Sequence, residues 1–255
     1  MGPGTFIGAQ WTPTIEPMDA KRLVRGIDEE LRSRGSPDRA RHDRSYLKSE
    51  LVHYGATVPA IRAAAKGVAS TYPTLSHDEV IALATALWAT PVYERRLVAV
   101  ELLDLYSDTL GPADGPVIEQ LLRDSATWAL VDGLAIHVVG RLVDRYQELG
   151  SMLDRWANDS DFWIRRSAML ALLVALRRGQ GDFERFSRYA DAMLDDSEFF
   201  IRKAIGWVLR DTAKKRPDLV YRWLLPRSSR ASGVTIREAV KPLSIPQREA
   251  VLAAR

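Results

Sequence analysis

Apolar residues recur at spacings of three and four along the chain from Asp19 onward, for example over residues 23–31 and 81–88. This period places apolar side chains on one face of an α-helix. Ser76 and Glu79 have the spacing of a capping box, which predicts a helix start. No stretch alternates polar and apolar residues between hairpin turns. We therefore predict an all-α fold.

The first residues lack this pattern. Residues 1–18 contain several glycines and prolines and show no helical periodicity. We expect them to form a poorly ordered leader. The remaining residues, 19–255, are expected to form a single helical domain.

The predicted helices also repeat at a longer period. Residues 160–166 (Ser-Asp-Phe-Trp-Ile-Arg-Arg) and 197–203 (Ser-Glu-Phe-Phe-Ile-Arg-Lys) are two copies of one segment. Residues 91–96 echo its aromatic and paired basic positions, and residues 125–128 form a weaker echo. A repeat of roughly 35 to 40 residues, each built from a helix pair, is typical of a HEAT-like α-solenoid. We predict such a curved stack, with a long concave binding surface.

A basic pair follows the helix start in each clear copy of the repeat. Such a pair can be an ordinary solvated helix face. A row of cations on a curved surface also suits a phosphate backbone, because each neutralised phosphate releases counterions. We therefore predict a basic concave face that binds nucleic acid, with a row formed by Arg95, Arg96, Arg165, Arg166, Arg202 and Lys203.

Composition excludes several other classes of protein. The chain has 255 residues and a formal net charge of +3, which permits a polyanionic partner without requiring one. It has no cysteine and four widely spaced histidines, so we expect no disulfide, no thiolate catalysis and no metal site. Its apolar stretches are shorter than the ~20 residues of a membrane span. There is no secretory signal pattern, so we place the protein in the cytoplasm.

Three polar or aromatic residues are out of place for a plain apolar core. Trp207 has mostly charged helical neighbours, which favours a half-exposed indole that packs on a sugar or base, although a core role stays open. Asp132 shares a helix face with Trp128 at the edge of an apolar surface. A buried carboxylate needs a partner, so a structural Asp bonded to a neighbouring helix also stays open. Arg166 has apolar neighbours and needs an anion, either Asp132 or a phosphate.

These residues give the chain a recognisable resemblance. From about Tyr46 to Lys241 it resembles the AlkD-like DNA alkylation-repair glycosylases. The strongest stretch is residues 198–210, Glu-Phe-Phe-Ile-Arg-Lys-Ala-Ile-Gly-Trp-Val-Leu-Arg. The other matching motifs are Tyr46-Leu47-Lys48 followed by Gly55 and Pro59, Leu87-Trp88 with Pro91, Trp128 with Asp132, and Arg237-Glu238-Ala239 with Lys241.

The resemblance implies HEAT-like repeats wrapped on duplex DNA and excision of positively charged N3- or N7-alkylated purines. It implies that Trp128 and Trp207 cradle the deoxyribose, that Asp132 is the catalytic carboxylate, that Arg166 is an active-site arginine, and that Tyr46 is the family's N-terminal tyrosine. Where the family often has a second tryptophan and an aspartate beside the first tryptophan, Thr127 and Ala129 stand here. We expect the DNA contacts to come from Tyr46, Lys48, Arg95, Arg96, Arg165, Arg202, Lys203, Arg237 and Lys241.

The chemistry fits this residue set. An alkylated purine cation leaves as a neutral base, so no general acid is needed, and positive charge develops on the sugar. A carboxylate such as Asp132, with indole faces beside it, stabilises that charge more in the transition state than in the ground state. No lysine occupies a matching position for a Schiff base. We therefore expect a monofunctional glycosylase that leaves an abasic site. The resemblance implies that it works without base flipping.

Other interpretations stay open. The lesion can be a methylated purine or a bulky natural-product adduct, as in a producer that protects itself. A non-catalytic paralogue that binds DNA structure and a HEAT scaffold that binds a protein are the competing classes. In the enzyme interpretation we expect a monomer, no cofactor, and alkylated double-stranded DNA as the partner.

Overall fold

The computed structural model describes residues 18–255, and within this range the chain is helical. Its one β contact there is an isolated bridge between Val52 and Val92. The all-α prediction is confirmed, whereas the predicted leader lies outside the described residues apart from Met18. The α-helices are α1 (Ala20–Ser33), α2 (Pro37–Leu47), α3 (Val58–Thr71), α4 (His77–Trp88), α5 (Tyr93–Leu105), α6 (Gly115–Arg123), α7 (Trp128–Gly133), α8 (Gly140–Arg145), α9 (Gly150–Trp156), α10 (Phe162–Leu170), α11 (Leu173–Arg177), α12 (Phe183–Ala192), α13 (Phe199–Ala213), α14 (Pro217–Leu224), α15 (Gly233–Ala239) and α16 (Ile245–Ala253).

Shorter helical segments connect several of these helices. A π-helical segment, η3 (Leu134–Val139), joins α7 to α8 in one continuous helix. The capping box predicted at Ser76 is present, because the side chains of Ser76 and Glu79 each accept a hydrogen bond from the other's backbone N–H. The 3-10 turns are η1 (Ser107–Thr109), η2 (Pro112–Asp114), η4 (Gln147–Leu149) and η5 (Leu225–Arg227).

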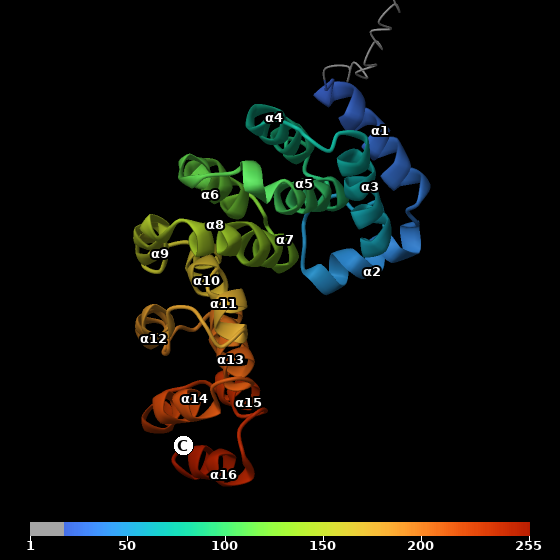
Figure 1. Cartoon of the computed structure of the whole chain (residues 1–255). Helices are drawn as coiled ribbons and strands as arrows, with labels where there is room; N and C mark the ends of the chain where they lie inside the picture. Colours follow the sequence, from blue (N-terminus) through green and yellow to red (C-terminus); the bar gives the residue numbers. More distant parts are fainter. Residues whose placement is uncertain (1–17) are drawn as a thin grey trace, which may run out of the picture.

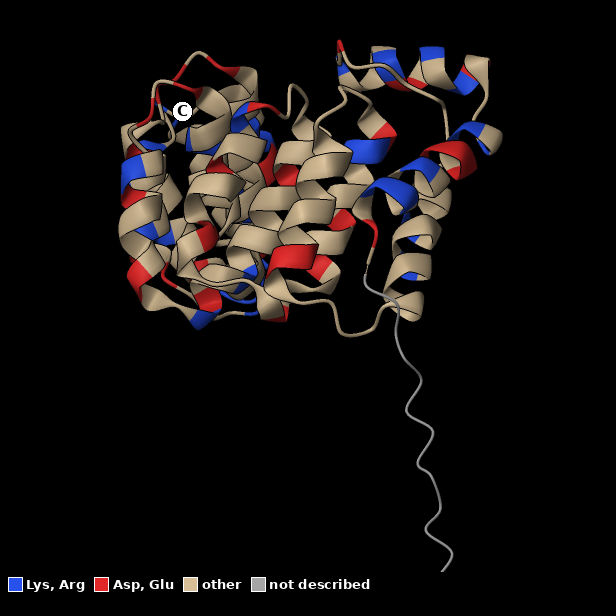
Figure 2. Cartoon of the chain, turned by 90° about the horizontal axis from the view of Figure 1, so that it is seen from above, with Lys and Arg blue, Asp and Glu red and all other residues tan. Residues whose placement is uncertain are grey.

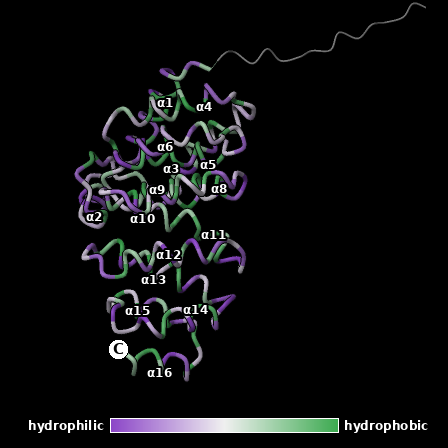
Figure 3. The backbone as a smooth tube through the Cα atoms, turned by 90° about the vertical axis from the view of Figure 1, so that its left-hand side faces the viewer, coloured by the Kyte–Doolittle hydropathy of each residue, from purple (hydrophilic) through white to green (hydrophobic). Residues whose placement is uncertain are grey.

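The helices from α4 to α15 stack in two layers (Figure 1). We call α4, α6, α9, α12 and α14 the outer layer, and α5, α7, α8, α10, α11, α13 and α15 the inner layer. Near the N-terminus, α3 packs on α5 and α1 packs on α4. This arrangement leaves α2 facing the inner layer across the concave side of the molecule (Figure 1). Figure 3 shows the same stack from the side, running from α1 to α16.

Polar contacts between neighbouring helix pairs recur at a separation of about one repeat. In the outer layer, Arg155 of α9 donates to Glu119 of α6, 36 positions earlier, at 2.8 Å. Arg227 donates to Asp191 of α12 at 2.6 Å, again over 36 positions. These contacts confirm the predicted repeat of roughly 35 to 40 residues and the HEAT-like α-solenoid.

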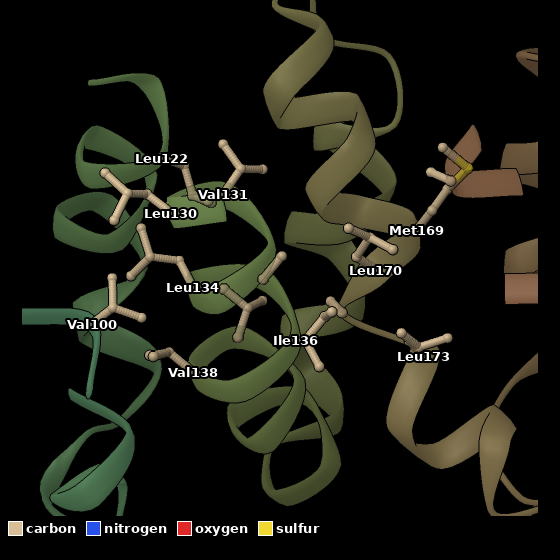
Figure 4. Packing of buried hydrophobic residues seen from close by; sticks show 14 of the residues in the cluster. Val100, Leu122, Leu130, Val131, Leu134, Ile136, Val138, Met169, Leu170 and Leu173 are labelled. Atoms are coloured by element: carbon tan, nitrogen blue, oxygen red, sulfur yellow. The ribbon is translucent and has the colours of Figure 1, made fainter. Parts of the chain in front are cut away.

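The buried apolar residues form one continuous cluster that extends from Ile27 to Val251. Figure 4 shows its centre, where Leu134 of the continuous α7–η3–α8 helix lies near Val100 of α5. A Cβ atom on Gly133 would lie 2.9 Å from a methyl group of Val100, so glycine permits the close approach of these two helices. No helix within residues 18–255 has the length and apolar character needed to cross a membrane.

Candidate active site

A pocket of about 470 Å³ lies where the end of α2 meets α7, α10 and α13 on the concave side. Its wall combines aromatic rings with charged groups of both signs. The five residues assigned to the site by the resemblance all lie in this wall. The lining residues are Tyr46, Lys48, Trp128, Asp132, Arg166, Phe199, Phe200, Lys203 and Trp207.

Asp132 and Arg166 form a bidentate ion pair across two repeats. The Nε and Nη2 atoms of Arg166 donate to the two carboxylate oxygens of Asp132 at 2.8 and 2.9 Å. The remaining Nη1 donates to the carbonyl of Phe200 at 2.5 Å. The Asp132 side chain is 12% exposed and the Arg166 side chain only 3%. Both side chains line the pocket, and the carboxylate is the more exposed of the two, while the guanidinium holds it in one orientation.

The helix that carries Asp132 is packed closely on both sides. Its π-helical segment begins two residues after Asp132, and such segments often occur at functional sites. Gly133 approaches α5, and a Cβ on Gly140 would lie 2.9 Å from the carbonyl oxygen of Ala171. These contacts fix the depth of Asp132 in the inner layer.

Trp128 and Tyr46 form one aromatic wall of the pocket. Their rings meet edge to face, with centroids 5.7 Å apart. Trp128 is the first residue of α7 and is partly buried, whereas Tyr46 is 63% exposed on the last turn of α2. The His42 ring stacks on Tyr46 at 6.3 Å and extends this aromatic surface along α2. An exposed phenol beside an indole provides a flat surface for a sugar or a base.

The loops that carry this wall contain left-handed residues. Lys48 and Ala126 each have φ of 52°, which is unfavourable for residues with a Cβ. Between them, the Thr127 hydroxyl donates to the carbonyl of Leu47 at 3.0 Å and ties the two loops together. Backbone strain of this kind is stored where the surrounding structure holds it, and functional sites are common examples. Thr127 is therefore buried, and its hydrogen bond connects the two loops that carry the aromatic wall.

Trp207 also lines the pocket, and a hydrogen bond from its indole holds it in place. The indole is partly buried, as its charged neighbours in the sequence suggested, and its Nε1 donates to Asp211 at 3.2 Å. Asp211 is buried and also accepts from Arg177 at 2.9 Å and from Lys214 at 2.8 Å. Burial acts to raise the pKa of Asp211, but the bonds from Lys214 and Arg177 outweigh it and lower the pKa.

Two further residues of the wall were missed by the sequence analysis. Phe199 and Phe200 line the pocket, and Phe199 is one of the few large apolar side chains that are exposed. The Nζ atom of Lys203 lies 5.7 Å from the centroid of the Phe199 ring. The repeated aromatic pair, Phe-Trp in one copy and Phe-Phe in the other, indicated only the architecture, and it is the exposure of Phe199 beside a cation that marks this residue as part of the candidate site.

The structure corrects the predicted row of cations at Arg95 and Arg96. Arg95 is partly buried, donates to the carbonyl of Ala86 at 3.2 Å and lies 3.6 Å from Asp28. Arg96 is buried and donates to the carbonyl of Asp124 at the end of α6. Both guanidinium groups satisfy groups within the protein, so the prediction that they face a phosphate backbone is wrong.

Arg165 and Arg202 also have internal partners. Arg165 donates to the carbonyl of Asp159 at 2.8 Å and to the carboxylate of Asp196 at 2.9 Å. The equivalent Arg202 donates to the carbonyl of Asp196 at 2.6 Å. In both copies of the repeated segment, the first basic residue therefore donates hydrogen bonds to the loop that precedes its own helix. Together with the buried Arg166, these contacts contradict a regular row of free cations.

The remaining predicted contact residues are exposed. Lys48 and Lys203 lie in the pocket wall, close to the residues that the resemblance assigns to the site. Arg237 and Lys241 are exposed near the C-terminus and do not line the pocket, and Lys241 pairs with Glu238 at 2.8 Å. Within residues 18–255, no group of three or more His, Asp or Glu side chains is placed to hold a metal ion.

The fold and this pocket define a HEAT-like repeat protein whose concave side carries a charged aromatic site. The chain belongs to the DNA alkylation repair enzyme family, whose model matches residues 27–243. The resemblance inferred from the sequence motifs is therefore confirmed. A search of curated proteins gave no matching sequence.

Solved structures show the same fold. A predicted DNA alkylation repair enzyme from Enterococcus faecalis superposes with a TM-score of 0.75 at 22% identity, covering 83% of this chain and 98% of that chain. AlkD2 from Streptococcus mutans gives a TM-score of 0.64 at 18% identity, over 89% of this chain and 100% of that chain. The smu.31 protein from Streptococcus mutans UA159 gives a TM-score of 0.59 at 18% identity, over 87% of this chain and 100% of that chain.

Proposed function

We propose that the chain is a DNA glycosylase that hydrolyses the N-glycosidic bond of cationic N3- or N7-alkylated purines in duplex DNA. The observation that carries this proposal is the Asp132 carboxylate, held by Arg166 at the wall of a pocket with aromatic side chains. Membership of the DNA alkylation repair enzyme family supports a role in alkylation repair. In this proposal the enzyme acts as a monomer, without a metal or cofactor.

The pocket suits a reaction in which positive charge moves from the base to the sugar. The alkylated base departs neutral, so the reaction needs no proton donor at the leaving group. Asp132 faces the developing oxocarbenium ion and orients the attacking water, and the faces of Trp128 and Trp207 add cation–π stabilisation. Preorganised groups of this kind typically contribute 10² to 10³ in rate, roughly 3 to 4 kcal/mol. Arg166 acts as a positioning residue through its bond to Asp132.

The lining residues favour contact with the sugar and backbone over reading of the base. Among residues 18–255, no Asn or Gln side chain lines the pocket to recognise a base edge. Exposed Lys48 and Lys203 stand beside the rings, where they can meet phosphates. We therefore propose excision without base flipping, with Tyr46, Lys48, Lys203, Arg237 and Lys241 on the DNA side.

The test is a panel of duplexes carrying 3-methyladenine, 7-methylguanine or a bulky N7 adduct. We expect release of free base and an abasic product that breaks only after alkali treatment. Strand cleavage without alkali, or borohydride trapping through Lys48 or Lys203, would overturn the monofunctional assignment. Duplex binding without release from any lesion would instead support a non-catalytic DNA-binding protein. Weak binding to all duplexes would support a protein scaffold. Preferential release of the bulky base would identify a self-resistance glycosylase.

A further inference from the structure

A second hollow lies beside the active-site pocket, at the C-terminal end of α2. Its volume is about 410 Å³, and three of its six lining residues are cations. Lys48 lines both this hollow and the active-site pocket, so the two are adjacent. The lining residues are Arg41, Arg44, Ser45, Lys48, Ser49 and Glu50. We refer to it as the α2 hollow.

The cations of the α2 hollow are largely free of internal partners. The ion pairs of α2 within the described residues are Arg39 with Asp43 and Arg41 with Asp38, and Asp38 itself is highly exposed. Arg44 and Lys48 are exposed and have no carboxylate partner among residues 18–255. This contrasts with Arg95, Arg165 and Arg202, which satisfy internal acceptors. Figure 2 shows the basic residues along α2, the helix at the upper right of that view.

The backbone turn after α2 gathers these residues. The N–H of Ser49 donates to the carbonyl of Arg44 at 3.2 Å, and Lys48 adopts its left-handed conformation between them. The turn therefore places Lys48 beside Arg44 and Ser45 on one side, and within reach of the active-site pocket on the other. Glycine would adopt the left-handed conformation of Lys48 more easily. The presence of a lysine at this strained position indicates that its side chain has a function.

We propose that the α2 hollow binds the backbone phosphate next to the damaged nucleotide. The proposal rests on the proposed function, since it places the deoxyribose in the neighbouring pocket. An arginine can grip a phosphate through two parallel N–H donors, and a lysine adds a point charge. Arg44, Lys48 and the Ser45 hydroxyl supply these groups. Bound in this way, one phosphate would fix the register of the sugar against Trp128 and Asp132.

The experiment measures binding to duplexes that carry a tetrahydrofuran abasic site. A neutral methylphosphonate replaces one phosphate at a time, at each of three positions on either side of the site. Wild-type protein is compared with Arg44→Ala and with Arg222→Ala, the control, which removes an exposed arginine from outer helix α14. Fluorescence anisotropy gives the Kd of each combination over a range of salt concentrations.

We expect Arg44→Ala to weaken binding about tenfold and to reduce the salt slope by about 1. One methylphosphonate next to the abasic site should weaken binding of wild type and of Arg222→Ala by a similar factor. The same substitution should have a clearly smaller effect on Arg44→Ala, because the Arg44 contact is already lost and only those of Lys48 and Ser45 remain to be weakened. If every methylphosphonate weakens Arg44→Ala as much as wild type, the proposal is overturned. Failure of wild type to release any alkylated base would refute the proposed function separately, since this experiment reads binding alone.

Discussion

Two arginine–aspartate pairs in this molecule have nearly the same local geometry. Arg166 binds both oxygens of Asp132 at 2.8 and 2.9 Å over 34 positions, and Arg227 binds both oxygens of Asp191 at 2.6 and 2.7 Å over 36 positions. Each arginine also donates to a backbone carbonyl, of Phe200 or of Trp223. Each guanidinium lies over the aromatic ring of that same residue, at 5.9 and 4.7 Å.

The two pairs differ in their surroundings. The inner pair is buried, with 12% exposure for Asp132 and 3% for Arg166, whereas the outer side chains of Asp191 and Arg227 are 32% and 27% exposed. Asp132 also borders a pocket that is lined by the indoles of Trp128 and Trp207. An ion pair at the repeat spacing is therefore an ordinary element of this scaffold. Its place in the inner layer, beside aromatic walls, is what distinguishes Asp132 as the catalytic carboxylate in the proposed function.

The largest expected difference concerns stability. Arg166→Ala leaves a buried carboxylate without its partner, which we expect to cost about 3–5 kcal/mol. Arg227→Ala removes a partly exposed pair and should cost about 1 kcal/mol or less. Urea unfolding monitored by circular dichroism measures both. Equal losses of unfolding free energy in the two variants would show that the inner pair contributes no more to stability than the outer pair.

The next comparison concerns two indoles. Asp211→Asn weakens the network that anchors Trp207, and we expect base release to slow about tenfold, or roughly 1.4 kcal/mol. The matched control is Ser187→Ala, which removes the acceptor, at 2.7 Å, of the Trp223 Nε1 proton on the outer side. Single-turnover release should be unchanged in this control. A slowing of release by Ser187→Ala equal to that of Asp211→Asn would remove the positioning role of Asp211.

The smallest effect is expected in the outer layer and depends on pH. The hydrogen bond from Arg155, opposed by burial and assisted by Arg123 and Trp156, lowers the pKa of Glu119 from 4.5 to about 2. Because the folded-state pKa is the lower one, this stabilisation is complete above about pH 4.5 and is lost as pH falls toward 2.

We therefore expect Glu119→Gln to lose about 1 kcal/mol at pH 7, since its partners are partly exposed and screened. The difference between the variant and wild type should shrink as the pH falls from 4.5 to 2. Urea unfolding at a series of pH values checks this. A difference that stays constant across the series would contradict the assignment to Glu119.

Most of the fold, and the residues at the centre of the candidate site, could be predicted from the sequence. Helical periodicity and the repeated segments predicted the solenoid, and the helical neighbours of Asp132 and Arg166 indicated that each needs a charged partner. Sequence spacing gives the direction of a side chain and not its depth, so Arg95 and Arg96 looked like surface cations. The left-handed Lys48 and Ala126 and the π-helical segment after Asp132 depend on tertiary contacts, and local propensity does not reveal them.

The central claim is tested most directly by Asp132→Asn beside Asp191→Asn, measured as single-turnover release of 7-methylguanine from an alkylated duplex. Both variants neutralise one member of a bidentate pair between repeats. We expect Asp132→Asn to lower the rate at least 10²- to 10³-fold while it still binds duplex, and Asp191→Asn to retain the wild-type rate. Release by folded Asp132→Asn at the wild-type rate would contradict the assignment of Asp132 as the catalytic carboxylate.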